Sequence, residues 1–392
     1  MAEAFIVEAV RTAGGRRNGR LAGWHPADVA GEVLNALLHR TGLDPRAIDD
    51  VILGCVTQAG EQSFAFARNA VLASGLPESV PAVTIDRQCG SSQQAVQFAA
   101  QAVLSGTQDI VIAGGAESMT RVPMFTNLSL HQKAGIGVGP MSDRIAARYG
   151  VKEFSQFKGA EMIARKYGFD REMLDRYALR SHQRAATATR AGAFAREIVP
   201  IPVETGEGVV DHLQDEGIRY DASLESIGSV KPLQEGGVIS AATASQICDG
   251  ASAALIVSER ALATHNLTPL ARIHSFVVTG GDPVIMLEEP IRATQRALEK
   301  AGMSLDDIDL YEVNEAFAPV PLAWLQALHA DPDKLNVNGG AIALGHPLGA
   351  SGTKLMATLV HALRAQGKRY GLQTMCEGGG TANVTILEAY RP

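Results

Sequence analysis

GLDPRAIDDV at residues 42–51 and GMSLDDIDLY at residues 302–311 are the two stretches from which we predict the fold. Each follows a segment with the periodicity of an amphipathic helix, residues 26–40 in the first case and residues 291–300 in the second. In both cases the glycine that opens the stretch stands where a helix commonly ends. The two stretches therefore indicate one helix–turn–strand unit that occurs twice in the chain.

The similarity extends further, because the same order of elements follows in both halves. A strand, a helix, a buried strand and a run of glycines are predicted at residues 51–56, 91–104, 109–113 and 114–115, and again at residues 310–313, 350–365, 371–375 and 378–380. Alternating strands and helices predict an α/β fold with layered sheets. The duplication predicts two pseudo-symmetric halves with a site where they meet, although two generic units could also match by chance.

A long segment without this repeat separates the halves. We predict an N-terminal half at residues 1–118, an insertion at residues 119–250 whose last segment returns to that half, and a C-terminal half at residues 251–392. The insertion contains a long helical pattern at residues 171–191 behind Asp170, which is suited to cap it. An insertion of this length on an α/β core often covers a substrate.

Composition limits the class of protein. The chain has 392 residues, of which 46% are hydrophobic and 20% charged, a balance typical of a globular protein too long for one core. Its net charge of −7 argues against a nucleic-acid partner, which selects a basic surface. We expect no signal peptide, no membrane-spanning helix, no metal site, and a cytoplasmic location in which the cysteines stay reduced.

Two cysteines lie at the ends of predicted strands, each next to glycine. Cys89 follows the strand at residues 82–85 and precedes a helix, so we expect the helix dipole and free N–H groups to favour its thiolate. Cys376 comes shortly before three glycines, which let other groups approach closely. A cysteine can equally be a small buried hydrophobe, and we interpret Cys55 and Cys248 in that way.

His346 and Asn314 complete the candidate chemistry. His346 lies in the glycine-rich stretch GGAIALGHPLGASG, where a neutral imidazole could accept a thiol proton; the alternative is a turn histidine. Asn314 follows the strand at residues 310–313 and could donate to a developing oxyanion or position a water. It could instead cap a helix over residues 316–328.

The motifs CGSS, NEAFA, GHPLGASG and CEGGG, in this order and spacing, resemble those of the thiolase family over essentially the whole chain. The resemblance implies an α/β fold of the thiolase-like type, a five-layer αβαβα sandwich of two similar halves with an inserted loop domain. It also implies an acyltransferase that exchanges acyl groups between a 3-oxoacyl-CoA and coenzyme A, without a permanently bound cofactor. A homodimer or homotetramer is the implied assembly.

The resemblance also implies roles for individual residues. Cys89 matches the nucleophile that takes the acyl group as a thioester, and His346 matches the base that activates it. Cys376 matches the acid and base that protonates the departing enolate carbon. Asn314 matches the residue that holds a water in one oxyanion hole with His346, and the backbone N–H groups of Cys89 and Gly378 match the second hole. Breaking a C–C bond beside a thioester needs both anion stabilisation and a proton donor.

The insertion and its neighbours are expected to hold the coenzyme. Arg219, Ser226, Ser245 and Phe317 resemble coenzyme-contacting positions, although Arg219 could equally be a solvated surface residue. Because the whole chain is acidic, the phosphates need a local basic patch. The run GGRR at residues 14–17 could contact phosphate, but we interpret it as a mobile turn.

Several residues depart from the usual thiolase pattern and bear on the choice of substrate: Gly90-Ser91-Ser92 after the nucleophile, Asp86 in place of Asn and Ala382 in place of Gly. The blocks DRQCGSSQQA and YGLQTMCEGGGTANVTI resemble bacterial thiolases that break down steroid-derived or other bulky acyl-CoAs. We therefore predict a degradative 3-oxoacyl-CoA thiolase of the beta-oxidation type.

Three alternatives are considered beside this prediction. The first is an acetoacetyl-CoA thiolase that works in the condensing direction. The second is a decarboxylating ketosynthase, against which Cys376 argues, because a proton-shuttling thiol is needed only where carbon acid chemistry occurs without decarboxylation. The third is a non-catalytic acyl-CoA carrier of the same fold, which fold alone does not exclude.

Overall fold

The computed structural model describes residues 2–206 and 208–390. Its main strands form one path in the order β11-β12-β13-β10-β1-β9-β5-β3-β4, with β2 (Gly15–Arg16) attached to β9 and β6 (Ile198–Val199) attached to β1. The N-terminal part of the path consists of β1 (Ala4–Thr12), β9 (Cys248–Ser258), β5 (Ile110–Ser118), β3 (Asp50–Gly54) and β4 (Ala82–Ile85). The C-terminal part consists of β10 (Ala271–Gly280), β13 (Thr381–Ala389), β12 (Tyr370–Glu377) and β11 (Leu310–Val313).

The two parts of the sheet have the same strand directions. In each, the first three strands are antiparallel neighbours and the following pair, β5–β3 or β12–β11, is parallel. Strand β4 extends the N-terminal part, parallel to β3. The parts join where β1 pairs with β10 over a short register, Phe5 with Arg272 and Ile6 with Ala271. The predicted pseudo-symmetry of the two halves is confirmed, whereas the domain boundaries at residues 118 and 250 stay a prediction.

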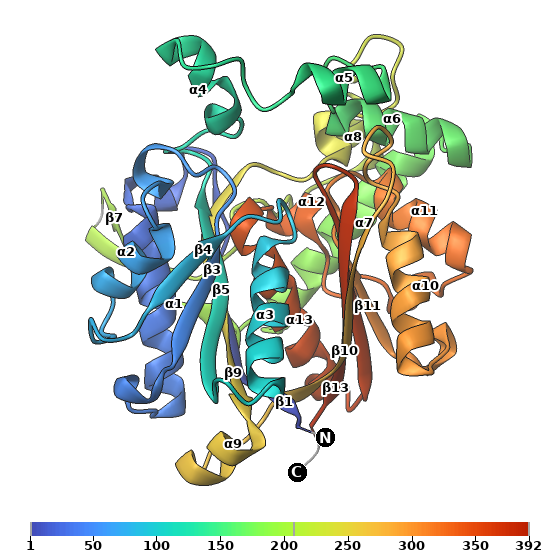
Figure 1. Cartoon of the computed structure of the whole chain (residues 1–392). Helices are drawn as coiled ribbons and strands as arrows, with labels where there is room; N and C mark the ends of the chain where they lie inside the picture. The colour runs from blue at the N-terminus through green and yellow to red at the C-terminus, as the bar shows by residue number, and fades with distance from the viewer. Residues whose placement is uncertain (1, 207, 391–392) are drawn as a thin grey trace.

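Helices separate and cover the two sheet parts, which produces five layers (Figure 1). The central layer contains α3 (Ser91–Leu104) and α13 (Ser351–Ala365), which pack against each other and against strands of both parts. The outer layers contain α1 (Pro26–Thr41) and α2 (Phe66–Ala73) on one side, and α10 (Pro290–Ala301) and α11 (Pro319–Leu328) on the other. Outside the insertion, two further short helices are α9 (Glu259–His265) and α12 (Ala341–Leu344).

The predicted helix ends are explained by local sequence. Pro26 occupies the first turn of α1, and the His25 side chain accepts a hydrogen bond from the backbone N–H of Ala27. Gly42 and Gly302 end α1 and α10 with φ of 65° and 64°, a left-handed conformation that costs glycine little. Short 3-10 helices connect other elements: Arg20–Gly23, Pro45–Ala47, Gly60–Gln62, Ala241–Thr243, Leu305–Asp307, Pro332–Lys334 and Leu348–Ala350.

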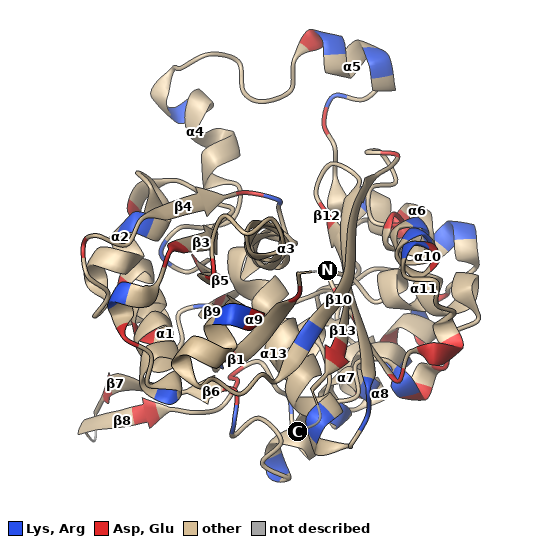
Figure 2. Cartoon of the chain, turned by 60° about the horizontal axis from the view of Figure 1, so that its bottom comes forward, with Lys and Arg blue, Asp and Glu red and all other residues tan. Residues whose placement is uncertain are grey.

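The central helix α3 carries no charged residue and is drawn entirely in tan in Figure 2. Its buried glutamines bond to the opposite sheet part instead of to water. Gln93 Nε2 donates to Thr385 Oγ1 over 3.0 Å, and Gln97 Nε2 donates to the carbonyl oxygen of Val384 over 2.9 Å. Because a buried amide without a partner costs free energy, these bonds fix α3 between the two halves.

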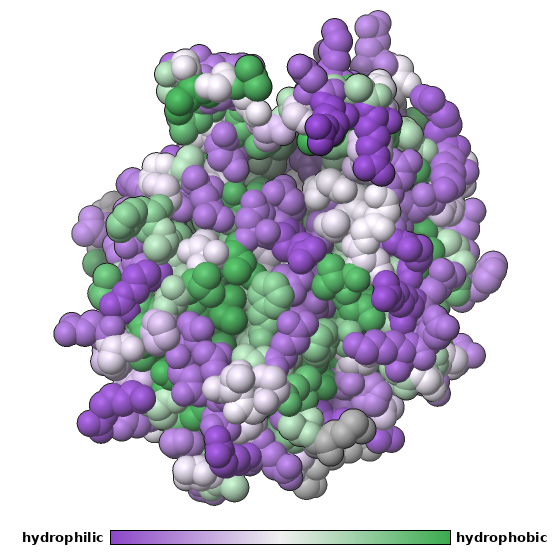
Figure 3. Space-filling model, viewed as in Figure 1, coloured by the Kyte–Doolittle hydropathy of each residue, from purple (hydrophilic) through white to green (hydrophobic). Residues whose placement is uncertain are grey.

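The insertion contains α4 (Thr126–Ala134), α5 (Asp143–Tyr149), α6 (Gln156–Tyr167), α7 (Arg171–Arg190), the β7–β8 hairpin (Ile201–Thr205 and Gly208–His212) and α8 (Leu224–Gly228). In Figure 1, α4, α5, α6 and α8 form a cap above one end of the layers, whereas the hairpin lies at the side of the N-terminal half, where β7 packs in one cluster with α1. Asp170 caps α7 as predicted, because its side chain accepts the backbone N–H of Met173. Helix α4 has no buried residue, and apolar surface is visible on it at the upper left of Figure 3.

No helix in the described ranges is both long enough and apolar enough to cross a bilayer.

Candidate active site

The turn between β4 and α3 presents Cys89. Asp86 shapes this turn, because its Oδ1 accepts the backbone N–H of Gln88 over 2.7 Å. Gln88 has a φ of 49°, a left-handed conformation that is strained for a residue with a side chain. Ser91 Oγ also accepts the backbone N–H of Arg87 over 2.9 Å. The turn is therefore held in one conformation that turns Cys89 toward the C-terminal half.

The Cys89 thiol does not behave as the helix position alone predicted. Burial, and to a smaller extent the nearby carboxyl of Glu377, raise its pKa to about 12, and the backbone N–H of Cys89 itself only partly offsets these effects. The expectation of a resting thiolate is wrong, since desolvation outweighs the helix terminus. Cys89 therefore rests as a thiol and needs a base when it attacks.

Gly90 lies at a close contact between the two halves. A Cβ atom on Gly90 would lie 2.0 Å from Glu377 Oε1 and 2.7 Å from Asn383 Nδ2. Asn383 Nδ2 also donates to the Gly90 carbonyl oxygen over 3.0 Å. A side chain at the residue after the nucleophile would therefore have to displace Glu377 or Asn383 of the C-terminal half.

His346 is held as a neutral imidazole with one defined tautomer. The Ser351 hydroxyl donates to the Pro347 carbonyl oxygen over 2.9 Å, so it accepts from His346 Nδ1 at 2.5 Å. The proton on Nδ1 leaves Nε2 as the acceptor, 3.4 Å from Asn314 Nδ2. Burial lowers the pKa of His346 to about 3, with a smaller effect from the charge of Lys354. His346 is therefore a base and not a resting imidazolium.

Buried charges fix the loop that precedes His346. Lys354 Nζ donates to the carbonyl oxygen of Leu344 over 2.5 Å and lies 3.5 Å from Asp215 Oδ1. Arg11, which is fully buried, forms ion pairs with the same Asp215 at 2.8 Å and with Glu197 at 2.6 Å. Sequence reasoning did not find these positioning residues, because their charges are brought together from distant segments.

Asn314 is a buried side chain with spare hydrogen-bonding capacity. Its backbone N–H donates to the Thr374 carbonyl oxygen over 3.1 Å, which aligns it with the end of β12. Its Oδ1 is buried and has no partner among the described residues, so a water or substrate donor could bind there. The alternative interpretation as a helix cap is wrong, because α11 begins at Pro319 with Ala318 as its N-cap residue.

Cys376 reaches the same place from the C-terminal half. It lies near the end of β12, fully buried, and burial raises the pKa of its thiol well above the usual value. The charges of Cys89 and Glu377 act on that pKa in the same direction as burial. A Cβ atom on Gly378 would lie 2.8 Å from Gln88 Oε1, so the glycine turn after Cys376 touches the turn that carries Cys89.

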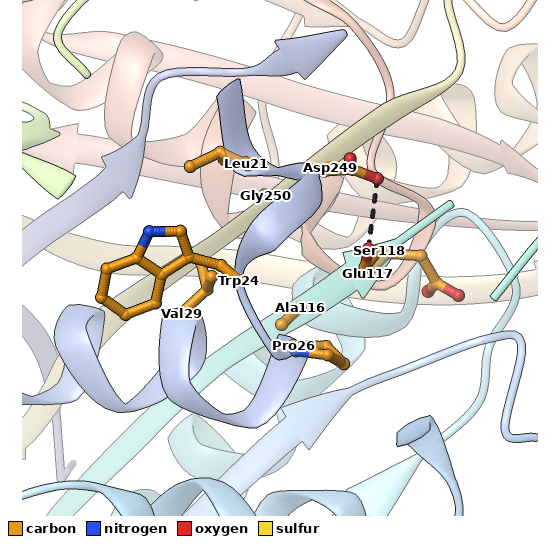
Figure 4. Close-up of a pocket in the computed structure, with 9 residues that line it drawn as sticks. All are labelled: Leu21, Trp24, Pro26, Val29, Ala116, Glu117, Ser118, Asp249 and Gly250. Atoms are coloured by element: carbon orange, nitrogen blue, oxygen red, sulfur yellow. Dashed lines mark hydrogen bonds between the residues drawn. The ribbon is translucent and has the colours of Figure 1, made fainter. Parts of the chain in front are cut away.

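Two more carboxylates that sequence reasoning missed position the site loops. Glu117, at the end of β5, accepts the backbone N–H groups of Val56, Thr57 and Gly349, each over 2.9 Å. Figure 4 shows it beside Ser118, whose hydroxyl bonds to Asp249 over 3.3 Å. Glu315 accepts from the Tyr177 hydroxyl over 2.9 Å, the Ser181 hydroxyl over 2.7 Å and the Ile342 backbone N–H over 3.0 Å. An isolated glutamate gives no sequence signal for such a role.

A cavity of about 740 Å³ connects this chemistry to solvent. His346 and Leu348 line its inner end, and Cys89 packs in one cluster with Leu348 and Met119, which also line the cavity. Three of the predicted coenzyme contacts line it as well: Arg219, Ser245 and Phe317. Ser226 does not: it lies in α8, where its hydroxyl donates to the Ser223 carbonyl oxygen over 3.0 Å. Its coenzyme contact stays a prediction.

Comparison with known proteins is consistent with this geometry. Residues 4–260 match a family model described as thiolase, N-terminal domain, and residues 267–389 match thiolase, C-terminal domain. The chain is 53% identical over 390 residues to the steroid 3-ketoacyl-CoA thiolase FadA6 of Mycobacterium tuberculosis, covering 99% of this chain and 94% of that protein. It is 42% identical over 392 residues to an acetyl-CoA acetyltransferase of Escherichia coli, covering 99% of both.

Solved structures resemble the whole chain. Human mitochondrial 3-ketoacyl-CoA thiolase superposes with a TM-score of 0.88 at 38% identity, covering 99% of both chains. The acetyl-CoA acetyltransferase of Bacillus anthracis superposes with a TM-score of 0.90 at 35% identity, covering 100% of this chain and 99% of that one. The predicted five-layer fold is confirmed.

Proposed function

This chain belongs to the thiolase family of acyltransferases, and we propose that it is a 3-oxoacyl-CoA thiolase acting in beta-oxidation-type catabolism. It would cleave a 3-oxoacyl-CoA with coenzyme A to give acetyl-CoA or propionyl-CoA and a shortened acyl-CoA. One observation carries this proposal: Cys89 packs in one cluster with Leu348 beside the cavity that His346 lines, and Asn314 lies against His346. The turn after Cys376 touches the turn that carries Cys89.

In the first half-reaction, Cys89 Sγ attacks the 3-oxo carbonyl carbon while His346 Nε2 takes the thiol proton. The pKa values of Cys89 and His346 oppose a resting ion pair, so the proton moves as the carbonyl oxygen becomes negative. A water held by Asn314, with His346, supports one oxyanion, and the backbone N–H groups of Cys89 and Gly378 support the other. The bond between C2 and C3 then breaks, leaving the acyl group on Cys89.

The electron pair of that bond becomes the enolate of acetyl-CoA or propionyl-CoA, which takes a proton from Cys376. In the second half-reaction Cys376 removes the proton from the thiol of incoming coenzyme A, whose sulfur attacks the thioester. Collapse of the tetrahedral intermediate releases the shortened acyl-CoA, and Cys89 recovers its proton from His346. Because both half-reactions share one acyl-enzyme, ping-pong kinetics are expected.

We infer a bulky, steroid-derived acyl group as the preferred substrate. The name of the relative with 53% identity includes a steroid substrate, and that similarity covers nearly the whole chain. Two unbranched and adaptable side chains, Met119 and Met124, line the cavity near Cys89, where an irregular acyl group could pack. A panel of short, long and polycyclic 3-oxoacyl-CoA substrates tests this: the polycyclic substrate should have the highest kcat/KM, and strict preference for acetoacetyl-CoA would contradict it.

The alternative is an acetoacetyl-CoA thiolase in the condensing direction, which the 42% identity to an acetyl-CoA acetyltransferase favours. The same panel separates the two. A non-catalytic carrier would show no acyl adduct on Cys89 by mass spectrometry after incubation with acetoacetyl-CoA, whereas a thiolase would.

The enzyme is expected to need no permanently bound cofactor and to work in the cytoplasm as a homodimer or homotetramer. Strand β4 is an edge strand with Val83 exposed, and Phe98 and Leu104 of α3 are also partly exposed on this side. Apolar surface in the middle of the face drawn in Figure 3 agrees with a subunit contact there. Light scattering of the purified chain would measure the assembly.

A further inference from the structure

The run Gly14–Arg17, which we interpreted from the sequence as a mobile turn, contains the short strand β2, and its Arg16 and Arg17 line the cavity. Gly15 and Arg16 form β2, paired antiparallel with Asp249 and Cys248 of β9. The backbone N–H of Arg16 donates to Glu216 Oε2 over 3.1 Å. The backbone at Arg16 is therefore fixed before any ligand binds, and Arg17 follows it directly in the chain.

Both arginine side chains line the same cavity as His346, together with Arg219. His346 is buried at the inner end, whereas Arg16, Arg17 and Arg219 are exposed, so the three guanidinium groups surround the mouth. Arg219 is itself held from below, because its backbone N–H donates to His182 Nδ1 over 3.2 Å. Three positive charges from two separate segments meet at one opening in a chain of net charge −7.

The arginine side chains have donors available for a ligand. Arg16 Nε lies 3.6 Å from Glu216 Oε1, which leaves its terminal nitrogens to face solvent. Arg17 forms no hydrogen bond or ion pair with any residue in the described ranges. Glu216 and Asp221 also line the cavity, so three guanidinium groups face two carboxylates. Since Glu216 is already bonded to the backbone N–H groups of Arg16 and Arg20, its charge is partly compensated.

We propose that Arg16 and Arg17 bind the phosphate groups of coenzyme A at the mouth of this cavity, opposite Arg219. This inference depends on the proposed function, because it takes coenzyme A as the ligand. A guanidinium presents several N–H groups in a plane and can bond a phosphate on one edge while a carboxylate holds another. The two arginines thus position the coenzyme and take no part in the reaction at Cys89.

Binding of coenzyme A, 3′-dephospho-coenzyme A and pantetheine, measured by calorimetry, tests the proposal. Arg17→Ala should weaken coenzyme A binding about fivefold to tenfold, and the double variant with Arg16→Ala should weaken it further, because exposed charged hydrogen bonds are lost. Pantetheine has no phosphate, so its binding should not change. In thiolysis assays KM for coenzyme A should rise while kcat stays constant, and added salt should reduce the difference.

The control is Arg296→Ala, which removes the same charge from the exposed face of α10 and should bind coenzyme A like the native enzyme. A loss that disappears with 3′-dephospho-coenzyme A assigns the contact to the 3′-phosphate; a loss that persists assigns it to the diphosphate. Unchanged coenzyme A binding, or an equal loss for pantetheine, would overturn the proposal. If the native chain itself fails to bind coenzyme A, the proposed function is rejected instead.

Discussion

The two halves of this protein share one scaffold but not one chemistry. Corresponding positions are 260 residues apart: Ser91 and Ser351 begin the central helices α3 and α13, and Ile110 and Tyr370 begin the strands β5 and β12. At the same spacing of 260 residues, each residue of the proposed chemistry corresponds in the other half to a residue of a different type. The pairs are Cys89 with Gly349, Asn314 with Gly54, Cys376 with Ala116 and His346 with Asp86.

The glycine counterparts have a steric reason. A Cβ atom on Gly349 would lie 2.6 Å from the Gly54 carbonyl oxygen, and one on Gly54 would lie 2.6 Å from the Ser91 Cβ. These positions in one half are filled by close backbone contact, so the corresponding position of the other half is left to carry a functional group. The two halves thus provide two copies of each loop position, and in each pair of corresponding positions only one carries a residue of the proposed chemistry.

Glu117 and Glu377 show the contrast most directly, because both are glutamates at corresponding strand ends. Glu117 accepts the three backbone N–H groups of the site loops and Gln62 Nε2 over 3.0 Å. Glu377 accepts the Thr381 hydroxyl over 2.6 Å, but its Oε1 has no partner among the described residues. Burial raises the pKa of both, and that of Glu377 to about 8. One glutamate holds loops, and the other titrates beside the thiols.

The largest expected effect comes from the pair Cys89 and Gly349. Cys89→Ala should lower thiolysis by about 10⁴-fold or more, because no nucleophile remains at either position. Mass spectrometry after incubation with a 3-oxoacyl-CoA should find no acyl adduct. Calorimetric binding of coenzyme A should be unchanged, which shows that the variant is folded. An adduct on another residue would break the assignment of the nucleophile to the N-terminal half.

Cys376→Ser separates the two halves of the chemistry. An alcohol is a much weaker acid than a thiol, so proton transfer to the enolate should slow and C–C bond exchange should fall by about 10³-fold. Acylation of Cys89 by a simple acyl-CoA donor should slow much less, because the departing coenzyme A thiolate is a far weaker base than the enolate carbon and depends less on a proton from residue 376. Mass spectrometry of the adduct and a thiolysis assay measure the two steps. Equal loss of both would contradict a separate role for Cys376.

Glu117→Gln tests the structural member of the glutamate pair. Glutamine has one acceptor oxygen where glutamate has two, and its NH₂ group would point at a backbone N–H donor. At least one buried donor therefore loses its acceptor, and the free energy of unfolding should drop by about 2–3 kcal/mol. Thermal and denaturant unfolding at fixed protein concentration measure this. Glu377→Gln is the matched control and should be neutral or stabilising near pH 7, because glutamine takes up no proton on folding. Equal destabilisation of both variants would remove the distinction between the two glutamates.

The smallest expected effect is a pH dependence set by Glu377. Its pKa in the folded chain is raised by burial to about 8, so the carboxyl is neutral below that pH and charged above it. The charged form raises the pKa of Cys89 and Cys376, so kcat/KM should fall a few-fold as pH rises through about 8. In Glu377→Gln this fall should disappear.

Thr381→Val tests in which direction the pKa of Glu377 moves the pH at which kcat/KM falls. The Thr381 hydroxyl bonds to the carboxylate and lowers the pKa of Glu377, while the charge of Arg87 acts in the same sense. Removing the hydroxyl should therefore move the fall in kcat/KM to higher pH. The same linkage makes ionised Glu377 destabilising, so stability should decrease as pH rises from the ordinary carboxyl pKa toward 8. A profile that stays the same in both variants would assign the fall to another group.

Sequence alone determined the features that depend on neighbouring residues. The repeated helix–turn–strand unit, the left-handed glycines Gly42 and Gly302, the cap at Asp170 and the strand–turn–helix position of Cys89 all follow from local conformational preference. These signals indicated the layered fold, whereas the roles of Cys89, His346, Cys376 and Asn314 were inferred from the resemblance of their motifs to the thiolase family.

Tertiary structure decided what those residues experience. The pKa of Cys89 follows from burial and from Glu377 of the other half, the same carboxyl leaves little room beside Gly90, and β2 holds Arg16 at the cavity by pairing with β9. Desolvation and steric contact depend on groups that are hundreds of residues away in the chain. No window of sequence contains them, so the chemical state of the site became visible only once the two halves were packed together.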